Sequence, residues 1–364
     1  MSAGGQRKKR VAVAMSGGVD SSVAAACLLE QGYEVIGLTM RLWSGEGGDA
    51  ARRTCCATED LDDARRVAQR LGIAFFVVDL EAEFRAAVVA DFVATYAAGQ
   101  TPNPCIRCNQ RLKFTHLLKK AQALEAEFLA TGHYAICTEG PSGPELWRGA
   151  DRHKDQSYFL FTVTADQLRH LRFPLGAMTK EQTRLQAERF GLHLAHKGES
   201  QDLCFVPDGD TAAFLAQSGE GLFAPGPIVD RAGNPLGLHR GLGGYTIGQR
   251  KGLGVSSAAP LYVVAIEAVG NRLVVGPEDA LWRKVLRVQE INWLGDEPLA
   301  LQKRVQIQIR YAAEAQPGLL KPLGSQVAEV VFDTPQRAIA PGQACVFYAG
   351  DRVLGGGWIQ PFGE

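Results

Sequence analysis

Cysteine thiols at two distant places are the side chains most suited to covalent chemistry. Cys105 and Cys108 are spaced C-x-x-C in TPNPCIRCNQ, and Cys204 lies in ESQDLCFVP. A pair at this spacing can ligate a metal, act as a redox couple or supply a nucleophile. A structural zinc normally needs four ligands, and no second C-x-x-C is present. We expect these three thiols to lie in exposed loops, and we expect buried apolar roles for three others: Cys27, Cys137 and Cys345.

A second chemical pattern is the stretch VAVAMSGGVDSSVAA, residues 11–25. The apolar run Val11–Ala14 suits a buried strand, and the aliphatic residues from Val23 onward suit a helix that stops at Gly32. The turn at residues 16–22 would then lie at a helix N-terminus, where unpaired backbone N–H groups and the helix dipole attract anions.

The composition of this turn indicates which anion it would bind. Gly17 and Gly18 let the backbone approach a ligand closely, and the serine hydroxyls add donors at Ser16, Ser21 and Ser22. No Gly-Lys-Ser/Thr follows, so the turn is not a Walker A loop. A loop made of serines and amides is better suited to a pyrophosphate.

The elements that must position these groups alternate between strand and helix in the first half. Strand-like runs occur at residues 11–14, 33–40, 73–80 and 127–133, and helical runs at residues 58–71, 83–98 and 111–124. This alternation predicts an α/β fold, a mostly parallel sheet with helices on both faces. Ligands bind beyond the carboxyl ends of such strands, so the turn after Ala14, Met40 and Gly132–His133 should gather at one edge.

The second half has a different pattern. Residues 139–157 suggest a hairpin and residues 179–190 a helix, and glycine and proline become frequent beyond residue 210. From about Lys284 short alternating runs such as VQIQIRY predict a small antiparallel β-barrel. We therefore expect a catalytic domain at 1–210, a small central domain at 211–283 and a C-terminal barrel at 284–364.

The composition limits the class of protein but does not indicate its substrate. The chain has 364 residues, 46% of them hydrophobic and 21% charged, and its formal net charge is zero. No apolar run is long enough to span a bilayer, and the start MSAGGQRKKR lacks the apolar core of a signal peptide, so we expect a cytoplasmic protein. Zero net charge argues against nonspecific coating of nucleic acid but allows a local basic face.

Several stretches together resemble one enzyme family. SGGVDSS resembles the pyrophosphate-loop (PP-loop) signature of the ATP pyrophosphatases, which adenylate an oxygen and then displace AMP. Along nearly the whole chain the sequence is similar to the tRNA 2-thiouridylases, which place sulfur on the wobble uridine (U34) of tRNA. The matching stretches are AMSGGVDSS, TPNPCIRCNQRLKF, ATGHY, KDQSYFL, ESQDLCF, YTIGQRKGLG and PGQACVFY.

The resemblance implies roles for individual residues. Cys108 matches the nucleophilic cysteine and Cys204 the cysteine that carries a persulfide. ATP contacts are implied for Ala14, Met15, Ser16, Gly17, Gly18, Val19, Asp20, Ser21, Met40 and Gly132. Contacts to tRNA are implied for Asn103, Pro104, Cys105, His133, Lys154, Asp155, Gln156, Arg310, Tyr311 and Gln343.

The resemblance also implies cofactors and partners. These are ATP with Mg²⁺, for which Asp20 is a candidate ligand, tRNAs of the lysine, glutamate and glutamine type, and a cysteine desulfurase or sulfur-relay protein. The protein is expected to be a monomer with no membrane association. Arg310 and Tyr311 offer the tRNA a cation and a stacking ring side by side.

The chemistry agrees with the residues. The C2 oxygen of uridine is a poor leaving group, and adenylation turns it into AMP, a good one. Sulfur must then arrive as a strong nucleophile, which a persulfide supplies, and a second thiol can attack its inner sulfur and leave a disulfide. The sequence therefore predicts a tRNA-uridine 2-sulfurtransferase.

One position departs from the family pattern. Many members carry aspartate where this chain has Cys105, so the acid/base assignment stays open. Three thiols are then available to one centre, and Cys105, Cys108 and Cys204 could instead hold a [4Fe–4S] cluster that carries sulfide. Another PP-loop synthetase and a noncatalytic RNA-binding protein remain as alternatives, and neither would need the thiol pair.

Overall fold

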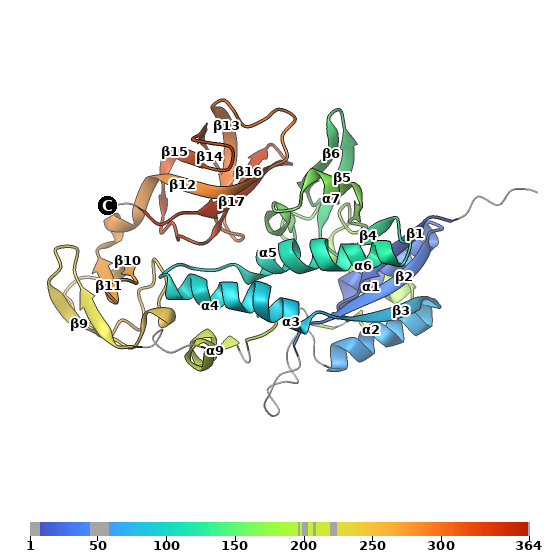
Figure 1. The fold of residues 1–364 in the computed structure, drawn as a ribbon, viewed down its shortest axis with the longest axis horizontal. Coiled ribbons are helices and arrows are strands. Elements are labelled where there is room, and N and C mark those ends of the chain that lie inside the picture. Colours follow the sequence, from blue (N-terminus) through green and yellow to red (C-terminus); the bar gives the residue numbers. More distant parts are fainter. Residues whose placement is uncertain are drawn as a thin grey trace, which may run out of the picture. The chain divides into compact units, whose positions relative to one another are not determined.

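The computed structural model describes residues 8–43, 58–195, 197–198, 203–206, 209–218 and 224–362 (Figure 1). The chain forms two compact units. The first contains Met1–Ala87, Cys105–Asp208 and Asp351–Val353, and the second contains Val88–Pro104, Gly209–Gly350 and Leu354–Glu364. The boundaries expected near residues 210 and 283 remain a prediction.

A five-stranded parallel sheet forms the centre of the first unit and confirms the expected fold class. Its order is β3-β2-β1-β4-β7. The strands are β1 (Arg10–Ala14), β2 (Glu34–Arg41), β3 (Ala74–Asp79), β4 (Phe128–Ala130) and β7 (Leu171–Arg172). From β1 the sheet extends through β2 on one side and through β4 on the other. In a parallel sheet, the place where the strand order reverses is where ligands bind, beyond the carboxyl ends of the strands.

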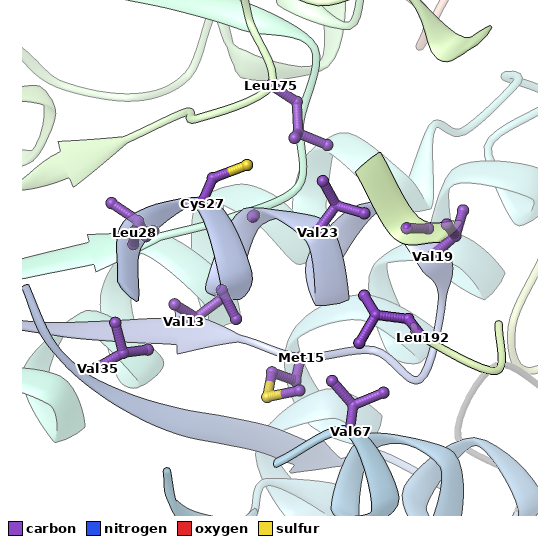
Figure 2. Close-up of a cluster of buried hydrophobic side chains, with 14 of the residues drawn as sticks. Val13, Met15, Val19, Val23, Cys27, Leu28, Val35, Val67, Leu175 and Leu192 are labelled. Carbon is purple, nitrogen blue, oxygen red and sulfur yellow. The ribbon is translucent and has the colours of Figure 1, made fainter. Parts of the chain in front are cut away.

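Helices α1 (Val19–Glu30) and α2 (Thr58–Leu71) pack against the sheet, and α8 (Lys180–Arg189) packs on α1. Their apolar side chains form a buried cluster with Val11 and Val13 of β1. Figure 2 shows Val13 and Met15 beside the residues of α1 that face the strand. Cys27 of α1 is 6% exposed within this cluster, which confirms its expected apolar role. The small residues of α1 let it lie close to the sheet, and this fixes where its N-terminus points.

The helices that follow differ from the expected ones. The predicted helix 83–98 is α3 (Glu81–Phe84), a π-helical turn (Arg85–Val89) and α4 (Ala90–Ala97). The predicted cysteine loop and the helix after it form one continuous helix: α5 (Pro104–Cys108), a π-helical segment (Asn109–Leu117) and α6 (Leu118–Ala123).

The expectation of a loop at Cys105 and Cys108 was therefore wrong, because both lie on α5. The physical reason is Pro104, whose fixed φ and missing N–H suit the first position of a helix.

The rest of the first unit contains the expected hairpin, β5 (Ala135–Gly140) and β6 (Gly143–Arg148). A 3₁₀ turn at Ser157–Leu160 and helix α7 (Ala165–Arg169) follow. The expected helix at residues 179–190 is α8, whose N-cap Thr179 and Gln182 form a capping box.

The second unit contains α9 (Thr211–Ser218) and two sheets. The smaller sheet has the order β10-β11-β8-β9, with β8 (Gly226–Val229), β9 (Pro235–His239), β10 (Tyr262–Glu267) and β11 (Arg272–Gly276). Short 3₁₀ turns lie at Leu242–Gly244 and Glu278–Leu281. A separate buried cluster that includes Ile228, Val263 and Leu273 stabilises this sheet.

The expected C-terminal barrel is confirmed. Its strands are β12 (Trp282–Trp293), β13 (Lys303–Gln308), β14 (Gln316–Pro322), β15 (Ala328–Arg337), β16 (Ala344–Ala349) and β17 (Arg352–Ile359). They pair in the order β12-β15-β14-β13-β16-β17, and β17 pairs again with β12, which closes the barrel. Its interior is filled by aliphatic and aromatic side chains together with the fully buried Cys345, which confirms the apolar role expected for this cysteine. No described helix has the length and apolar character that crossing a membrane requires.

Substitution Leu28→Ala tests whether the cluster beneath α1 holds the first unit together. Leu28 is 2% exposed, so its truncation leaves a cavity and should lower the free energy of unfolding by about 2–5 kcal/mol. Leu185→Ala on α8 is the matched control, since Leu185 is 58% exposed and its truncation should change stability by less than about 0.5 kcal/mol. Urea denaturation of both variants measures the difference, and equal effects would contradict this account of the core.

Candidate active site

The turn between β1 and α1 is shaped to leave backbone donors open. Gly17 has φ +72°, a conformation that favours glycine, and Gly18 is the N-cap of α1 and contributes no side-chain hydrogen bond to it. The first N–H groups of α1 therefore lack a side-chain cap, and they are oriented beyond the carboxyl end of β1. Such a helix N-terminus is suited to phosphate oxygens.

The sequence suggested that all three serines of this turn offer hydrogen-bond donors to a ligand, but only Ser16 is positioned to do so. The Ser21 hydroxyl accepts from Ser16 N (3.1 Å) and donates to Gly18 O (3.1 Å), and the Ser22 hydroxyl donates to the same carbonyl (2.9 Å). Both side chains are buried, because α1 begins at Val19 and not at Val23. Ser21 and Ser22 thus hold the loop in shape, while Ser16 is exposed.

Gly132, which follows β4, lies against the first turn of α1. A Cβ atom at this position would be 2.7 Å from Ser21 N and 2.8 Å from the carbonyl carbon of Asp20. On the other side of β1, Ala14 pairs with Leu38, so Met40 lies two residues beyond the end of β1 toward the same edge. The structure thus brings three of the sequence-predicted ATP segments together at one edge of the sheet.

Asp20, in the first turn of α1, is held by two groups that the sequence did not indicate. Lys180 Nζ donates to both of its carboxylate oxygens at 2.8 Å, and the Tyr134 hydroxyl donates to Oδ1 at 2.9 Å. The Tyr134 hydroxyl also lies 2.9 Å from Thr183 Oγ1 of α8. Since Lys180 is 160 residues from Asp20, only the packing of α8 beside α1 reveals the pair.

A second lysine, Lys197, contacts the loop between β1 and α1. Its ammonium group donates to Gly17 O at 3.0 Å and to one carboxylate oxygen each of Asp60 and Asp63, both on α2, at 2.7 Å. Burial opposes the charge of Asp63, but hydrogen bonds from Lys197 and His193 outweigh it and lower the pKa of this carboxyl group. Neither lysine belongs to a recognisable sequence motif around the loop.

The cysteines differ in exposure. Cys108 is 9% exposed on α5, Cys105 on the same helix is exposed, and Cys204 is half-buried. Cys137, for which we expected a buried apolar role, is half-buried, and its thiol lies 3.7 Å from Leu168 O. Burial raises the pKa of this thiol to about 11.

The segments that carry Cys108 and Cys204 are both supported by the α3 region. Phe205, next to Cys204, meets Phe84 of α3 edge to face at 5.5 Å between ring centroids. Three residues after Cys108, Arg111 Nη1 donates to Ala87 O at 2.7 Å, in the π-helical turn that continues α3.

Asn109, directly after Cys108, is a residue that the sequence analysis missed. Its Nδ2 donates to Phe159 O at 3.1 Å, while its Oδ1 is buried without a hydrogen-bond partner among the residues that the structure describes. The side chain is 3% exposed. A buried acceptor without a partner is costly, and its burial keeps this oxygen out of reach of a ligand.

His133 is placed as a neutral group. Its Nδ1 lies 2.6 Å from Thr131 Oγ1, and its ring packs between those of Phe114 and Phe173 at 6.1 and 6.2 Å. Burial, together with the charge of Lys113, holds the pKa of this imidazole well below its usual value of 6.5. A neutral imidazole is suited to a hydrogen bond with a base or ribose and not to a charge contact with phosphate.

The segment 154–156 contains one residue with a structural role. Asp155 is 6% exposed, and its carboxylate accepts hydrogen bonds from the residues around it: Arg148 Nη1, Gly149 N, Ser157 N and Ser157 Oγ. The Gln156 side chain accepts from Tyr134 N at 3.1 Å. These bonds argue that Asp155 shapes the turn and that a direct tRNA contact would come from its neighbours.

In the second unit, Gln343 supports the segment before α5. Its Nε2 donates to Thr101 O at 3.1 Å and to Pro102 O at 2.9 Å, and Thr101 N donates to Pro341 O at 2.8 Å. The PGQ turn of the barrel thus holds the residues that lead into Asn103 and Pro104.

Arg310 and Tyr311 differ from the expected side-by-side pair. Arg310 Nη2 donates to Arg337 O at 2.7 Å and also to Ala338 O, so this guanidinium is engaged with the barrel backbone. Tyr311 is 41% exposed. The buried Gln308 side chain donates to the carbonyls of both residues and fixes their turn. The ring of Tyr311 is the better presented of the two groups.

Comparison with known proteins gives a consistent assignment. The family model described as tRNA methyl transferase HUP domain matches residues 9–208, the PRC-barrel domain model of the same name matches 212–277, and the aminomethyltransferase beta-barrel domain model matches 283–359. The tRNA-specific 2-thiouridylase MnmA of Magnetococcus marinus is 60% identical over 96% of this chain and 99% of its own length. That of Paracoccus denitrificans is 51% identical over 96% of this chain and 91% of its own.

Gly132→Ala tests the close approach of β4 to α1. The added Cβ would collide with backbone atoms of Asp20 and Ser21, so the first turn of α1 must move. A displacement that costs about 1–3 kcal/mol should weaken ATP binding about ten- to hundredfold, as isothermal titration calorimetry would measure. Gly324→Ala is the control, because a Cβ there meets nothing within 4 Å, and its affinity should match the parent protein.

His133 should make stability depend on pH. Its folded-state pKa is lowered, so below its ordinary value of 6.5 the unfolded chain binds a proton more readily than the folded chain. The contribution is fully present above pH 6.5 and should be lost progressively as pH falls toward the lowered pKa. In urea titrations across pH 5–7, His133→Gln should reduce this slope, and an unchanged slope would contradict the assignment.

Proposed function

The chain belongs to the tRNA-specific 2-thiouridylase family, and from this membership we propose how its residues divide the work of the reaction. The enzyme is an ATP-dependent tRNA sulfurtransferase that replaces the C2 oxygen of U34 with sulfur and releases AMP and pyrophosphate. The observation that carries the residue assignment is the loop at Gly17–Val19. It presents uncapped helix N–H groups at the edge of the sheet reached also by Met40 and Gly132.

In the adenylation step, the N–H groups at the start of α1 bind the ATP phosphates, with Ser16 as an added donor. The adenosine lies beyond the ends of β1, β2 and β4, contacted by Met40 and Gly132. The C2 oxygen of the uridine attacks the α-phosphorus and pyrophosphate leaves. The helix dipole and the ammonium of Lys180, on the adjacent first turn of α8, stabilise the charge that develops on the leaving group.

In the sulfur step, the terminal sulfur of a persulfide on Cys204 attacks C2, and AMP departs with the former C2 oxygen. The thiolate of Cys108 then attacks Sγ of Cys204. The S–S bond of the persulfide breaks, its electron pair remains on the sulfur bound to C2, and a Cys108–Cys204 disulfide forms. An external thiol reductant returns both cysteines to thiols.

The His, Cys, Asp and Glu side chains around the site indicate which metal cofactors it could hold. Among the residues that the structure describes, which include all three cysteines of interest, no three His, Cys, Asp or Glu side chains group closely enough to hold a metal. Cys105, Cys108 and Cys204 do not fit an iron–sulfur cluster in this arrangement. Asp20 is occupied by Lys180 and Tyr134, so Mg²⁺ would be bound chiefly by phosphate oxygens and water.

We propose the remaining partners on chemical grounds. The persulfide sulfur must come from a cysteine desulfurase or a relay protein that reaches Cys204. The tRNAs are those of the lysine, glutamate and glutamine type, and their contacts come from His133, Lys154, Gln156 and Tyr311. We also propose that the enzyme acts as a monomer.

Serine substitution separates the two thiols that take part in the proposed cycle, Cys108 and Cys204, from Cys105, which does not. Cys108→Ser and Cys204→Ser should each lower 2-thiouridine formation by more than about 10³-fold, because each removes an obligatory sulfur atom. ATP binding should be unchanged. Thiouridine content is measured by nucleoside mass spectrometry of tRNA after incubation with ATP and persulfide-loaded enzyme.

Cys105→Ser is the control on the same helix. A two-thiol cycle does not use the sulfur of Cys105, and serine keeps a polar side chain of similar size for the tRNA contact implied there, so activity should stay within about threefold of the parent enzyme. Loss of activity in Cys105→Ser, together with iron in the purified parent protein, would overturn the persulfide assignment in favour of a cluster.

A further inference from the structure

Helix α3 begins at the carboxyl edge of the parallel sheet. Leu80 directly follows the last residue of β3 and is 5% exposed, and its N–H donates to the carbonyl of Arg41, the last residue of β2, at 3.0 Å. The Phe84 N–H in turn donates to Leu80 O at 2.8 Å. The first turn of α3 is therefore attached to the sheet at the edge where the loop between β1 and α1 also lies, because these strands are parallel.

Side chains of α3 and of the π-helical turn after it hold this element in one arrangement. Arg85 forms an ion pair with Glu81 at 3.0 Å, and the central carbon of its guanidinium lies 4.0 Å from the centroid of the Trp43 ring. The same tryptophan meets the fully buried Phe84 edge to face at 6.5 Å between ring centroids. Single π-helical turns of this kind are frequent at functional sites. An element packed from several sides can support the segments that contact it.

The first segment that contacts this element carries Cys204. Val206 N donates to Leu203 O at 3.0 Å and closes a turn that contains the thiol. The two side chains after the cysteine are buried, with Phe205 1% exposed and Val206 3% exposed. Phe205 meets Phe84 edge to face at 5.5 Å between ring centroids. Because Phe205 directly adjoins Cys204, a shift of the Phe205 ring would move the turn and its thiol.

The second segment is the helix that carries Cys108. Arg111, three residues further along this helix, donates from Nη1 to Ala87 O at 2.7 Å. Ala87 lies in the π-helical turn, three residues after Phe84 on one continuous helix. Both links consist entirely of residues that the structure describes. One short element thus contacts both segments that carry the thiols of the proposed cycle.

We propose that α3 and its π-helical continuation form a common support for the two thiols, with Phe84 and Arg111 as positioning residues. Phe84 acts on the sulfur carrier Cys204 through Phe205. Arg111 acts on the nucleophile Cys108 through the helix that they share. This inference rests on the proposed roles of the two cysteines. The competing idea is that Arg111 binds a tRNA phosphate directly, and its hydrogen bond to a main-chain carbonyl argues against that role.

Loss of either contact should affect a different step of the cycle. After the persulfide sulfur has attacked C2, an S–S bond joins the tRNA to Cys204 until the Cys108 thiolate attacks Sγ of Cys204 and releases it. Arg111→Met displaces only the helix of Cys108. Release of 2-thiouridine should therefore fall about 100-fold, the cost of misplacing a reacting group by about 1 Å, and the tRNA–enzyme adduct should accumulate. Phe84→Ala displaces Cys204 before it attacks C2, so 2-thiouridine should fall by a similar factor without adduct.

The experiment uses enzyme loaded with persulfide by a cysteine desulfurase and free cysteine, with the loading checked by mass spectrometry. A single turnover without external thiol yields 2-thiouridine, measured by nucleoside mass spectrometry. The adduct appears as a slowly migrating tRNA band on a non-reducing denaturing gel, and a thiol reductant removes it. Adenylation, followed as tRNA-dependent exchange between ATP and labelled pyrophosphate, and the KM for tRNA should stay within about threefold of the parent values.

Matched variants control for general loss of stability. Phe84→Leu fills most of the same space with an apolar side chain and should recover most of the loss. Phe332→Ala removes a phenylalanine of the barrel that is also fully buried. Arg304→Met removes a hydrogen bond to Asp333 that is 2.7 Å long, the same length as the bond from Arg111. Neither barrel variant should lower 2-thiouridine formation or produce adduct.

The outcomes separate the inference from the proposed function. If the parent enzyme forms no 2-thiouridine when Cys204 carries a persulfide, the assignment of Cys204 is wrong. If the parent is active and Arg111→Met releases product at the parent rate, or only its KM for tRNA rises, the positioning role of Arg111 is overturned. If exchange and sulfur transfer fall together in Phe84→Ala, that residue only supports the fold. Should Phe84→Ala fail to fold, Phe205→Ala removes the same ring contact from the other side, and parent activity in that variant would overturn the role of the contact.

Discussion

The close packing of β4 on the first turn of α1 is the constraint on which the site depends. Where Gly132 follows β4, even a methyl group would collide with Ser21 N, so the strand end and the helix start touch backbone to backbone. This contact fixes the direction of α1, and the direction of α1 decides where its uncapped N–H groups point. The parallel sheet contributes the rest, because it ends β1, β2 and β4 at the same edge.

The positive charge near the phosphate site comes from distant segments and not from the loop. A Walker A loop carries its own lysine, whereas here Lys180 and Lys197 reach the loop from 160 and 180 residues away. Each is bonded to carboxylates and not left exposed, which keeps it charged and fixed. A loop built this way is tied to α8 through Lys180 and to α2 through Lys197.

The sequence predicted those parts of the molecule that are encoded locally. The strand–turn–helix at residues 10–30, the hairpin after Ala135 and the capped helix α8 follow from apolar periodicity, glycine and capping residues. Prediction from the local sequence pattern failed where tertiary packing determines the structure. Pro104 begins a helix that the two prolines of TPNP made look like a loop, and Ser21 and Ser22 turned inward because α1 starts at Val19. The lysine contacts could not be predicted, since nothing in a linear pattern relates residues so far apart.

The burial of Cys108 limits the groups with which its thiol can react. A thiol that is 9% exposed reacts only with a group that the protein itself brings to it, so it cannot accept sulfur at random from solution. Cys105, one helical turn earlier on α5, is exposed and lacks this selectivity. In the proposed cycle the partner of Cys108 is Cys204, whose neighbour Phe205 is buried and packs on Phe84. The difference in exposure between Cys105 and Cys108 thus makes only Cys108 dependent on a partner that the protein supplies.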